Sequence, residues 1–292
     1  MLTHTARRLP LGLRPLRLLG CKAPPRTLAQ TRATDQADSD LWHARGDASL
    51  RSPGRLALAE TSVQFVTSKF ETGDDRQAAF IPPHPVFLAA SAAGVGRKDI
   101  AFDDNALDRI AAEINRALES ELAARGWRLV HTPDILAADA YARFDTLPPH
   151  QVHHVRPVNH AAPHPRRVRP KRVHPAGAAG VITGPSGRRE AQARQALLNE
   201  LGADALLRVI IRVGVYQGRA SFEEGSRLLL TTPNAQTDLT ARHSLLSDRS
   251  VLTDEATDGD FIVSEQAYLD ATRNTAPLFL SRALDALQPT RP

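Results

Sequence analysis

Cysteine is nearly absent from this chain, since Cys21 is the only one in 292 residues. A single cysteine excludes an intramolecular disulfide and any zinc site built from several thiolates. No run of about 18 or more apolar residues occurs, so we expect no transmembrane helix. Aromatic residues make up only 5% of the chain. The core is therefore expected to consist mostly of leucine, valine, isoleucine and alanine.

Acidic residues are missing from two segments that carry much of the positive charge. Residues 1–34 hold seven lysines and arginines and no acid, and residues 150–174 hold six and no acid. The chain has a net charge of +5 and a pI near 9.8, so everything outside these segments sums to −8. We therefore expect an acidic folded body, and the high pI alone does not indicate nucleic acid.

The amino terminus has the order of a secretory signal. Arg7 and Arg8 precede a leucine-rich stretch that ends at the small residue Gly20, directly before Cys21. A positive region, a short apolar region and a small residue before the cleavage point are typical of such signals. Two other interpretations stay open, a mitochondrial transit peptide and an unprocessed basic tail, because arginines interrupt the apolar stretch.

The stretch Leu18-Leu19-Gly20-Cys21 also resembles a bacterial lipobox. The resemblance implies that Cys21 becomes the diacylated first residue of an exported protein. It further implies, through Lys22, retention at the outer membrane. We accordingly expect residues 1–21 to be signal-like and residues 22–54, which are polar and lack periodicity, to be a disordered linker.

The clearest helical pattern spans residues 103–126. An aspartate stands at its start and Gly126 at its end, which are typical capping positions. Apolar residues recur at helical spacing and form one stripe, which consists of Leu107, Ile110, Ile114, Leu118 and Leu122.

Three further stretches are predicted as helices. Residues 132–144 begin with Thr132 as the expected N-cap, followed by proline at the first helical position. Residues 186–202 run from a serine cap to a closing glycine, and residues 264–287 form the last helix. We expect that helix to be kinked or broken at Pro277.

Strands are predicted at residues 55–70, 127–130 and 203–217, and in a meander over 225–233 and 237–253. The third of these alternates strictly, which indicates an antiparallel strand with one buried and one wet face. We therefore predict an α/β (α+β) fold, a mixed and largely antiparallel sheet backed by helices. It forms a single domain over residues 55–288 that a long disordered loop interrupts at about 145–185. The expected wet face of the clearest strand carries Arg208, Arg212 and Tyr216.

The element order and the stretch "LGADALLRVIIRVGVY" resemble the small α/β domain of bacterial envelope lipoproteins related to the TolB amino-terminal domain and the curli-secretion channel subunit. The resemblance covers roughly residues 55–145 and 186–288. It implies an assembly or protein-binding role in the cell envelope, on the periplasmic face of the outer membrane.

The segment 150–174 is the main candidate for chemistry outside the amino terminus. Ligand-like spacing makes His150, His153 and His154 weak metal candidates, but four prolines and the absence of local carboxylates argue against a metal site. Its cations could contact an anion or a membrane headgroup. We interpret the segment mainly as a solvated linker. The anion-binding candidates are Arg156, Arg166, Arg167, Arg169, Lys171 and Arg172.

No nucleophile, base and oxyanion donor combine into a recognisable catalytic motif, so we expect no catalytic residues, no cofactor and no enzymatic activity. The prediction is an exported, lipid-anchored protein with a macromolecule-binding or assembly role, an envelope protein as its partner, and oligomer formation left open. One alternative is a mitochondrial or cytoplasmic protein that binds an anion or nucleic acid through residues 150–174. The lack of aromatic residues in that segment disfavours nucleic acid. A second alternative is a hydrolase with an unrecognised site.

Overall fold

The computed structural model describes most of the chain between residues 41 and 288, together with two short pieces before it. The described residues are 26–27, 29, 41–50, 54–65, 68–70, 97–99, 102, 104–144, 146–147, 153–154, 171–173, 181–182, 188–216, 218–253 and 263–288.

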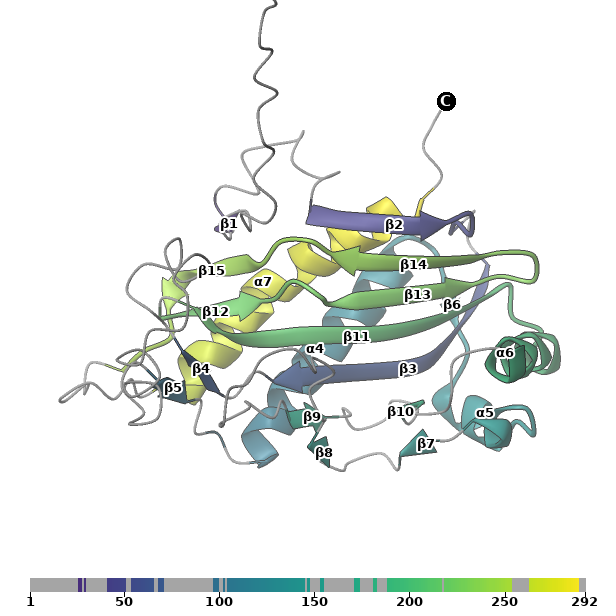
Figure 1. The fold of residues 1–292 in the computed structure, drawn as a ribbon, viewed down its shortest axis with the longest axis horizontal. Coiled ribbons are helices and arrows are strands. Elements are labelled where there is room, and N and C mark those ends of the chain that lie inside the picture. Colours follow the sequence, from purple (N-terminus) through teal and green to yellow (C-terminus); the bar gives the residue numbers. More distant parts are fainter. Residues whose placement is uncertain are drawn as a thin grey trace, which may run out of the picture.

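A large mixed sheet forms the centre of the molecule (Figure 1). Hydrogen-bonded neighbours run in the order β1-β15-β12-β11-β13-β14-β2, while β3 lies on the other side of β11 and pairs also with β6 and β9. Two small sheets, β4 with β5 and β7 with β10, accompany it. The strands are β1 (Arg26–Thr27), β2 (Trp42–Gly46), β3 (Arg55–Phe65), β4 (Ser68–Phe70), β5 (Arg97–Asp99), β6 (Arg128–Leu129), β7 (Thr146–Leu147), β8 (His153–His154), β9 (Lys171–Val173), β10 (Val181–Ile182), β11 (Ala205–Tyr216), β12 (Arg219–Phe222), β13 (Arg227–Thr231), β14 (Gln236–Ala241) and β15 (Leu245–Ser250).

The longest strand, β11, organises the sheet. It runs parallel to β3 on one edge and antiparallel to β13 and β12 on the other, where these two strands lie end to end. β14 and β15 pair with β13 and β12 in the same end-to-end manner. Residues 223–226 separate β12 from β13, and residues 242–244 separate β14 from β15. The two breaks lie side by side in the sheet, so each pair of strands acts as one long, interrupted strand.

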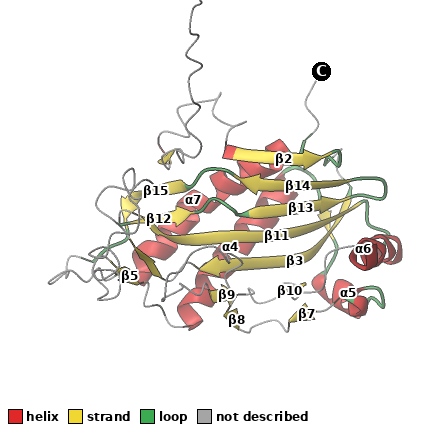
Figure 2. Cartoon of the chain, viewed as in Figure 1, coloured by secondary structure: helices red, strands yellow, loops and turns green. Residues whose placement is uncertain are grey.

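Two long helices, α4 (Asp104–Ala124) and α7 (Glu265–Ala286), pack side by side on one face of the sheet (Figures 1 and 2). The expected apolar stripe of α4 is completely buried in the main core. Opposite it, alternate residues of β11 from Leu207 to Val215 are buried as well. The ring of Phe279 on α7 lies 4.8 Å from Trp42 and 5.2 Å from Phe222, measured between ring centroids.

A second, smaller core lies on the opposite face, at one end of the sheet. There α5 (Thr132–Ala137), the 3-10 helix η2 (Tyr141–Arg143) and α6 (Arg188–Leu201) pack over Ala57 and Ala59 of β3 and Leu206 of β11. Small side chains on β3 leave room for the helices to approach the sheet. At this end of the sheet, helices therefore cover both faces. Along the rest of the sheet, α4 and α7 cover one face.

The predicted fold class is confirmed, because the structure is a mixed, largely antiparallel sheet backed by helices. The helices and β11 lie where their patterns predict them, except that residues 132–144 form two elements, α5 and η2, because the backbone turns to an extended conformation at Ala138. The final helix is capped by Ser264, whose side chain accepts a hydrogen bond from the Ala267 amide, and it continues without a break through Pro277. The N-cap of α5 is His131 and not Thr132, because the backbone enters the helix one residue earlier than expected.

The expected linker at 22–54 is wrong in its described carboxyl-terminal part. Residues 42–46 form β2, and Leu41, Trp42, Ala48 and Leu50 belong to the main core. The physical reason is that antiparallel pairing with β14 carries this stretch over α7, where the Trp42 ring meets Phe279. β12 was not expected either, and it closes a hairpin with β11 around Gly218, which has φ +70°.

Candidate functional site

Most of the residues that the sequence singles out lie outside the described part of the chain. This holds for Cys21, the lipidation candidate, for His150, and for the anion-binding candidates Arg156, Arg166, Arg167 and Arg169. Of the remaining candidates, the backbone alone is described, in β8 for His153 and His154 and in β9 for Lys171 and Arg172.

The described backbone attaches two pieces of the 150–174 segment to the sheet. β9 pairs antiparallel with the end of β3, so that Arg172 is opposite Gln64 and Lys171 is opposite Phe65. β8 then pairs with β9, which brings His153 opposite Arg172. The register thus places part of the basic segment beside β3, and β3 is the only strand between β9 and β11 in the described part of the sheet.

The sheet face that points away from α4 and α7 carries the clearest arrangement of charges. We call it the arginine face and define it by Arg45 and His43 on β2, Glu60 on β3, Arg208, Ile210 and Arg212 on β11, Arg227 and Leu229 on β13, and Asp238 and Thr240 on β14. Strand register aligns five of these residues in one row across five strands, which we call the charge row, in the order Glu60, Arg208, Leu229, Asp238 and Arg45. Charges of opposite sign therefore recur along the row.

Glu60 and Arg208 form the innermost pair of the row. A register shift between Leu207 and Arg208 lets β3 accommodate an extra residue, which brings Glu60 opposite Arg208. The Arg208 guanidinium donates from Nε and Nη2 to Glu60 Oε2 at 3.0 and 2.9 Å, and Ser62 Oγ donates to Oε1 at 3.1 Å. Glu60 is completely buried, and these hydrogen bonds compensate for the cost of removing its carboxylate from water.

Asp238 and Arg227 form the second pair, closer to the solvent. Arg227 Nε donates to Asp238 Oδ1 at 2.6 Å, and its Nη2 contacts Oδ2, a two-pronged geometry that suits guanidinium and carboxylate. The Arg227 side chain is 52% exposed. A small open hollow lies between the two pairs, lined by Arg208, Ile210, Arg227 and Leu229.

Arg212 stands where the long strands are interrupted. Its backbone N–H donates to Ser226 Oγ at 2.9 Å and its Nη1 donates to the Glu224 carbonyl at 3.2 Å. A Cβ added to Gly225, which has φ +80°, would come within 2.8 Å of Arg212 Nη1. Glycine at this position therefore makes room for the guanidinium.

Three guanidinium groups on this side of the sheet lack a carboxylate partner among the described residues. They belong to Arg45, Arg212 and Arg219, the last of which donates to the Ser247 carbonyl at 3.2 Å. Arg45 is exposed, and His43, two residues earlier on β2, is exposed as well. The arginine face thus offers cations that the protein itself does not neutralise within its described part.

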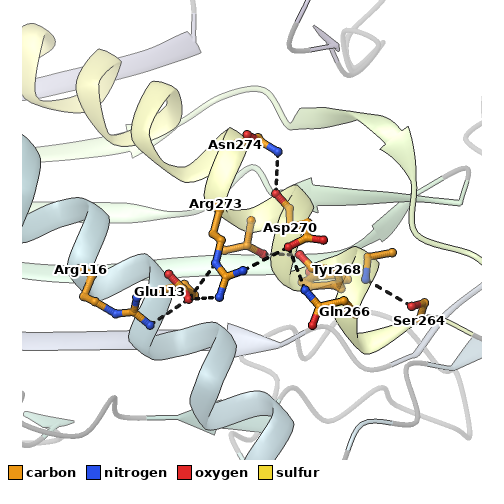
Figure 3. Close-up of polar contacts among 10 residues, drawn as sticks. Glu113, Arg116, Ser264, Gln266, Tyr268, Asp270, Arg273 and Asn274 are labelled. Atoms are coloured by element: carbon orange, nitrogen blue, oxygen red, sulfur yellow. Dashed lines mark hydrogen bonds and ion pairs between the residues drawn. The ribbon is translucent and has the colours of Figure 1, made fainter.

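A separate polar network joins α4 to α7 on the helical side of the molecule (Figure 3). Arg273 Nε and Nη2 donate to Glu113 Oε1 at 3.0 and 2.8 Å, and Arg116 reaches the same oxygen at 2.9 Å. Arg273 also contacts Asp270 of its own helix at 3.2 Å. Burial opposes ionisation of Glu113, but the hydrogen bonds and charges of Arg273 and Arg116 outweigh it and lower the Glu113 pKa.

This network holds the two helices together, which is a structural role. The neighbouring Tyr268 is fully buried and donates to the Gly214 carbonyl of β11 at 2.9 Å, which ties α7 to the sheet. Burial and the negative charge of Glu223 raise the Tyr268 pKa. Neither arrangement offers a free reactive group.

The described residues contain no group of three or more histidine, cysteine and carboxylate side chains that could hold a metal ion. The alternation of β11 predicts Arg208 and Arg212 as outward-facing residues, but no sequence pattern predicts Glu60, Asp238 or Arg45. Their only signal is the strand register, which no local pattern encodes. Within the described residues, no helix is both long and apolar enough to cross a membrane.

Comparison with known proteins adds no further assignment, because no family model, curated protein or solved structure matches the chain.

Proposed function

We propose that this chain is a non-catalytic binding protein whose arginine face docks an acidic partner protein, and that it is held at the cell envelope through lipidated Cys21. The observation that carries the binding role is the set of guanidinium groups on this face without a carboxylate partner in the described part, foremost exposed Arg45. Such cations favour a partner of opposite charge and steer its approach.

The paired residues of the face support the same role. Glu60 and Asp238 hold Arg208 and Arg227 in place through multiple hydrogen bonds. A cationic surface on a rigid sheet loses less conformational freedom on binding than cations on flexible loops. The face is therefore suited to recognition by fixed geometry.

Retention on immobilised polyglutamate tests the binding role. The double variant Arg45→Gln/Arg212→Gln should elute at lower salt than wild type. The double variant Arg109→Gln/Arg116→Gln removes the same charge from α4, in the opposite layer, and should elute close to wild type. Both variants keep the basic segments 1–34 and 150–174, so their difference reports on the arginine face. Equal elution of the two variants would refute the proposal.

The envelope location rests on the sequence of the amino terminus. Palmitate labelling and membrane fractionation of wild type and Cys21→Ala test it. We expect label and membrane association in wild type and loss of both in the variant. If wild type stays soluble and unlabelled, the lipid anchor is wrong, whereas the binding role is unaffected.

The alternative of an anion-associated protein that uses residues 150–174 is favoured by one observation, the attachment of Lys171 and Arg172 to the sheet through β9. It predicts salt-sensitive retention on heparin that deletion of residues 150–174 abolishes. Retention that the deletion leaves unchanged would end this alternative.

A further inference from the structure

We propose that β2 is a docking edge, which takes up an acidic, extended segment of the partner protein as an additional strand of the sheet. The inference rests on the proposed function, since it specifies how the acidic partner binds at the arginine face. Main-chain hydrogen bonds at a sheet edge supply affinity in this kind of recognition, and side chains on the edge supply selectivity.

The backbone of β2 has the geometry of a free edge. Within the part of the chain that the structure describes, β2 pairs with β14 alone and ends the order of the sheet. The Arg242 N–H donates to the Leu41 carbonyl at 2.9 Å, which makes these residues a hydrogen-bonded pair. Pairs alternate along antiparallel strands, so His43 and Arg45 direct their backbone groups to β14. The N–H and C=O of Ala44 consequently point away from the sheet.

The charge row reaches this edge with a cation. Glu60, Arg208, Asp238 and Arg45 alternate in sign, and Arg45 is the last member, on β2. A carboxylate on an incoming strand opposite Arg45 would continue the alternation. That position is a non-hydrogen-bonded pair on the outer side, where the Cα atoms approach to about 4.5 Å and cross-strand side chains interact most closely.

The same residues select the occupant. A second copy of β2 would bring a further Arg45 side chain to an edge that already carries one, and like charges on facing strands are destabilising. Short, cationic edges of this kind resist pairing with themselves. An acidic strand meets no such repulsion, so the charges on β2 favour a partner of that chemistry over self-association.

A fluorescent peptide of alternating valine and glutamate serves as the probe, and its lysine counterpart serves as the control, both measured by anisotropy against the full chain. Wild type should bind the glutamate peptide at least about tenfold more tightly than the lysine peptide, since opposite charges across strands attract and like charges repel. The variant Arg45→Glu should reverse this preference. Ala44→Pro removes the outward N–H without touching the pairing with β14, and should abolish binding of both peptides.

Circular dichroism and the melting temperature establish that each variant is folded. If folded Ala44→Pro binds the glutamate peptide as wild type does, strand addition is wrong. If the chain instead forms dimers that Ala44→Pro disrupts, the occupant is a second copy, which also overturns the proposal. If Arg45→Gln/Arg212→Gln weakens polyglutamate retention while Ala44→Pro changes neither assay, the proposed function stands and the docking edge alone fails.

Discussion

At the scale of single residues, two glycines with positive φ differ in what surrounds them. Gly46 has φ +123°, and a Cβ there would lie 2.0 Å from the Gln236 carbonyl oxygen. Gly202, directly after α6, has φ +55° and a nearest neighbour at 3.8 Å, the Arg55 side chain. The first position forbids a side chain by contact with backbone, whereas the second only strains the backbone conformation.

We therefore expect Gly46→Ala to lower the free energy of unfolding by about 3 kcal/mol or more, because backbone of β2 or β14 must shift. Gly202→Ala should lower it by about 1 kcal/mol, the cost of placing alanine in the left-handed region. Urea unfolding followed by circular dichroism measures both. Equal losses would contradict the close packing of β2 on β14.

The two carboxylates of the charge row differ in burial, and this difference predicts different energetic roles. Glu60→Gln should lower the free energy of unfolding by about 3 kcal/mol, because it removes the carboxylate charge that pairs with the Arg208 guanidinium, which is only 13% exposed. Asp238→Asn breaks a pair whose arginine is 52% exposed, and should cost less than about 1 kcal/mol. Urea unfolding of both variants checks the order, and a larger loss in Asp238→Asn would contradict it.

At the scale of elements, Glu113 makes the contact between α4 and α7 sensitive to pH. Its pKa is lowered from 4.5 in the folded state, so the ionised form stabilises the protein above that value. The stability is lost as the pH falls from 4.5 through the folded pKa. Glu113→Gln should reduce the free energy of unfolding at neutral pH by about 1 kcal/mol, since Arg273 and Arg116 are largely exposed and screened.

The difference between wild type and Glu113→Gln should shrink as the pH is lowered below 4.5. Urea unfolding of both proteins across this range measures it, and general acid destabilisation cancels in the difference. A constant difference at all pH values would show that the glutamate contributes through packing and not through its charge.

The same scale shows what the sequence can predict. The sequence predicts the buried stripe of α4 and the alternation of β11, because each element repeats its hydrophobic pattern over many residues. β12, at four residues, and β2, at five, are too short to establish a period. The charge row depends on the register between strands distant in sequence, such as β3 and β11, and local patterns carry no information about that register.

At the scale of the whole molecule, the position of β2 decides where the folded domain begins. The sequence predicts this boundary at residue 55, because residues 22–54 are polar and lack periodicity. In the structure, the main core includes Leu41, Trp42, Ala48 and Leu50, and the Leu50 N–H donates to the Leu287 carbonyl at 2.8 Å. The stretch before β3 therefore links the far edge of the sheet to the end of α7.

A chain that begins at residue 55 should consequently lose about 5 kcal/mol or more of unfolding free energy relative to the full chain, since truncating a single large buried side chain already costs about 3–5 kcal/mol. A chain that begins at residue 41 keeps these contacts and should melt near the temperature of the full chain. Calorimetry of the two truncated chains measures the contrast. If both melt alike, residues 41–54 behave as the linker that their composition suggests, and the docking edge on β2 loses its structural basis.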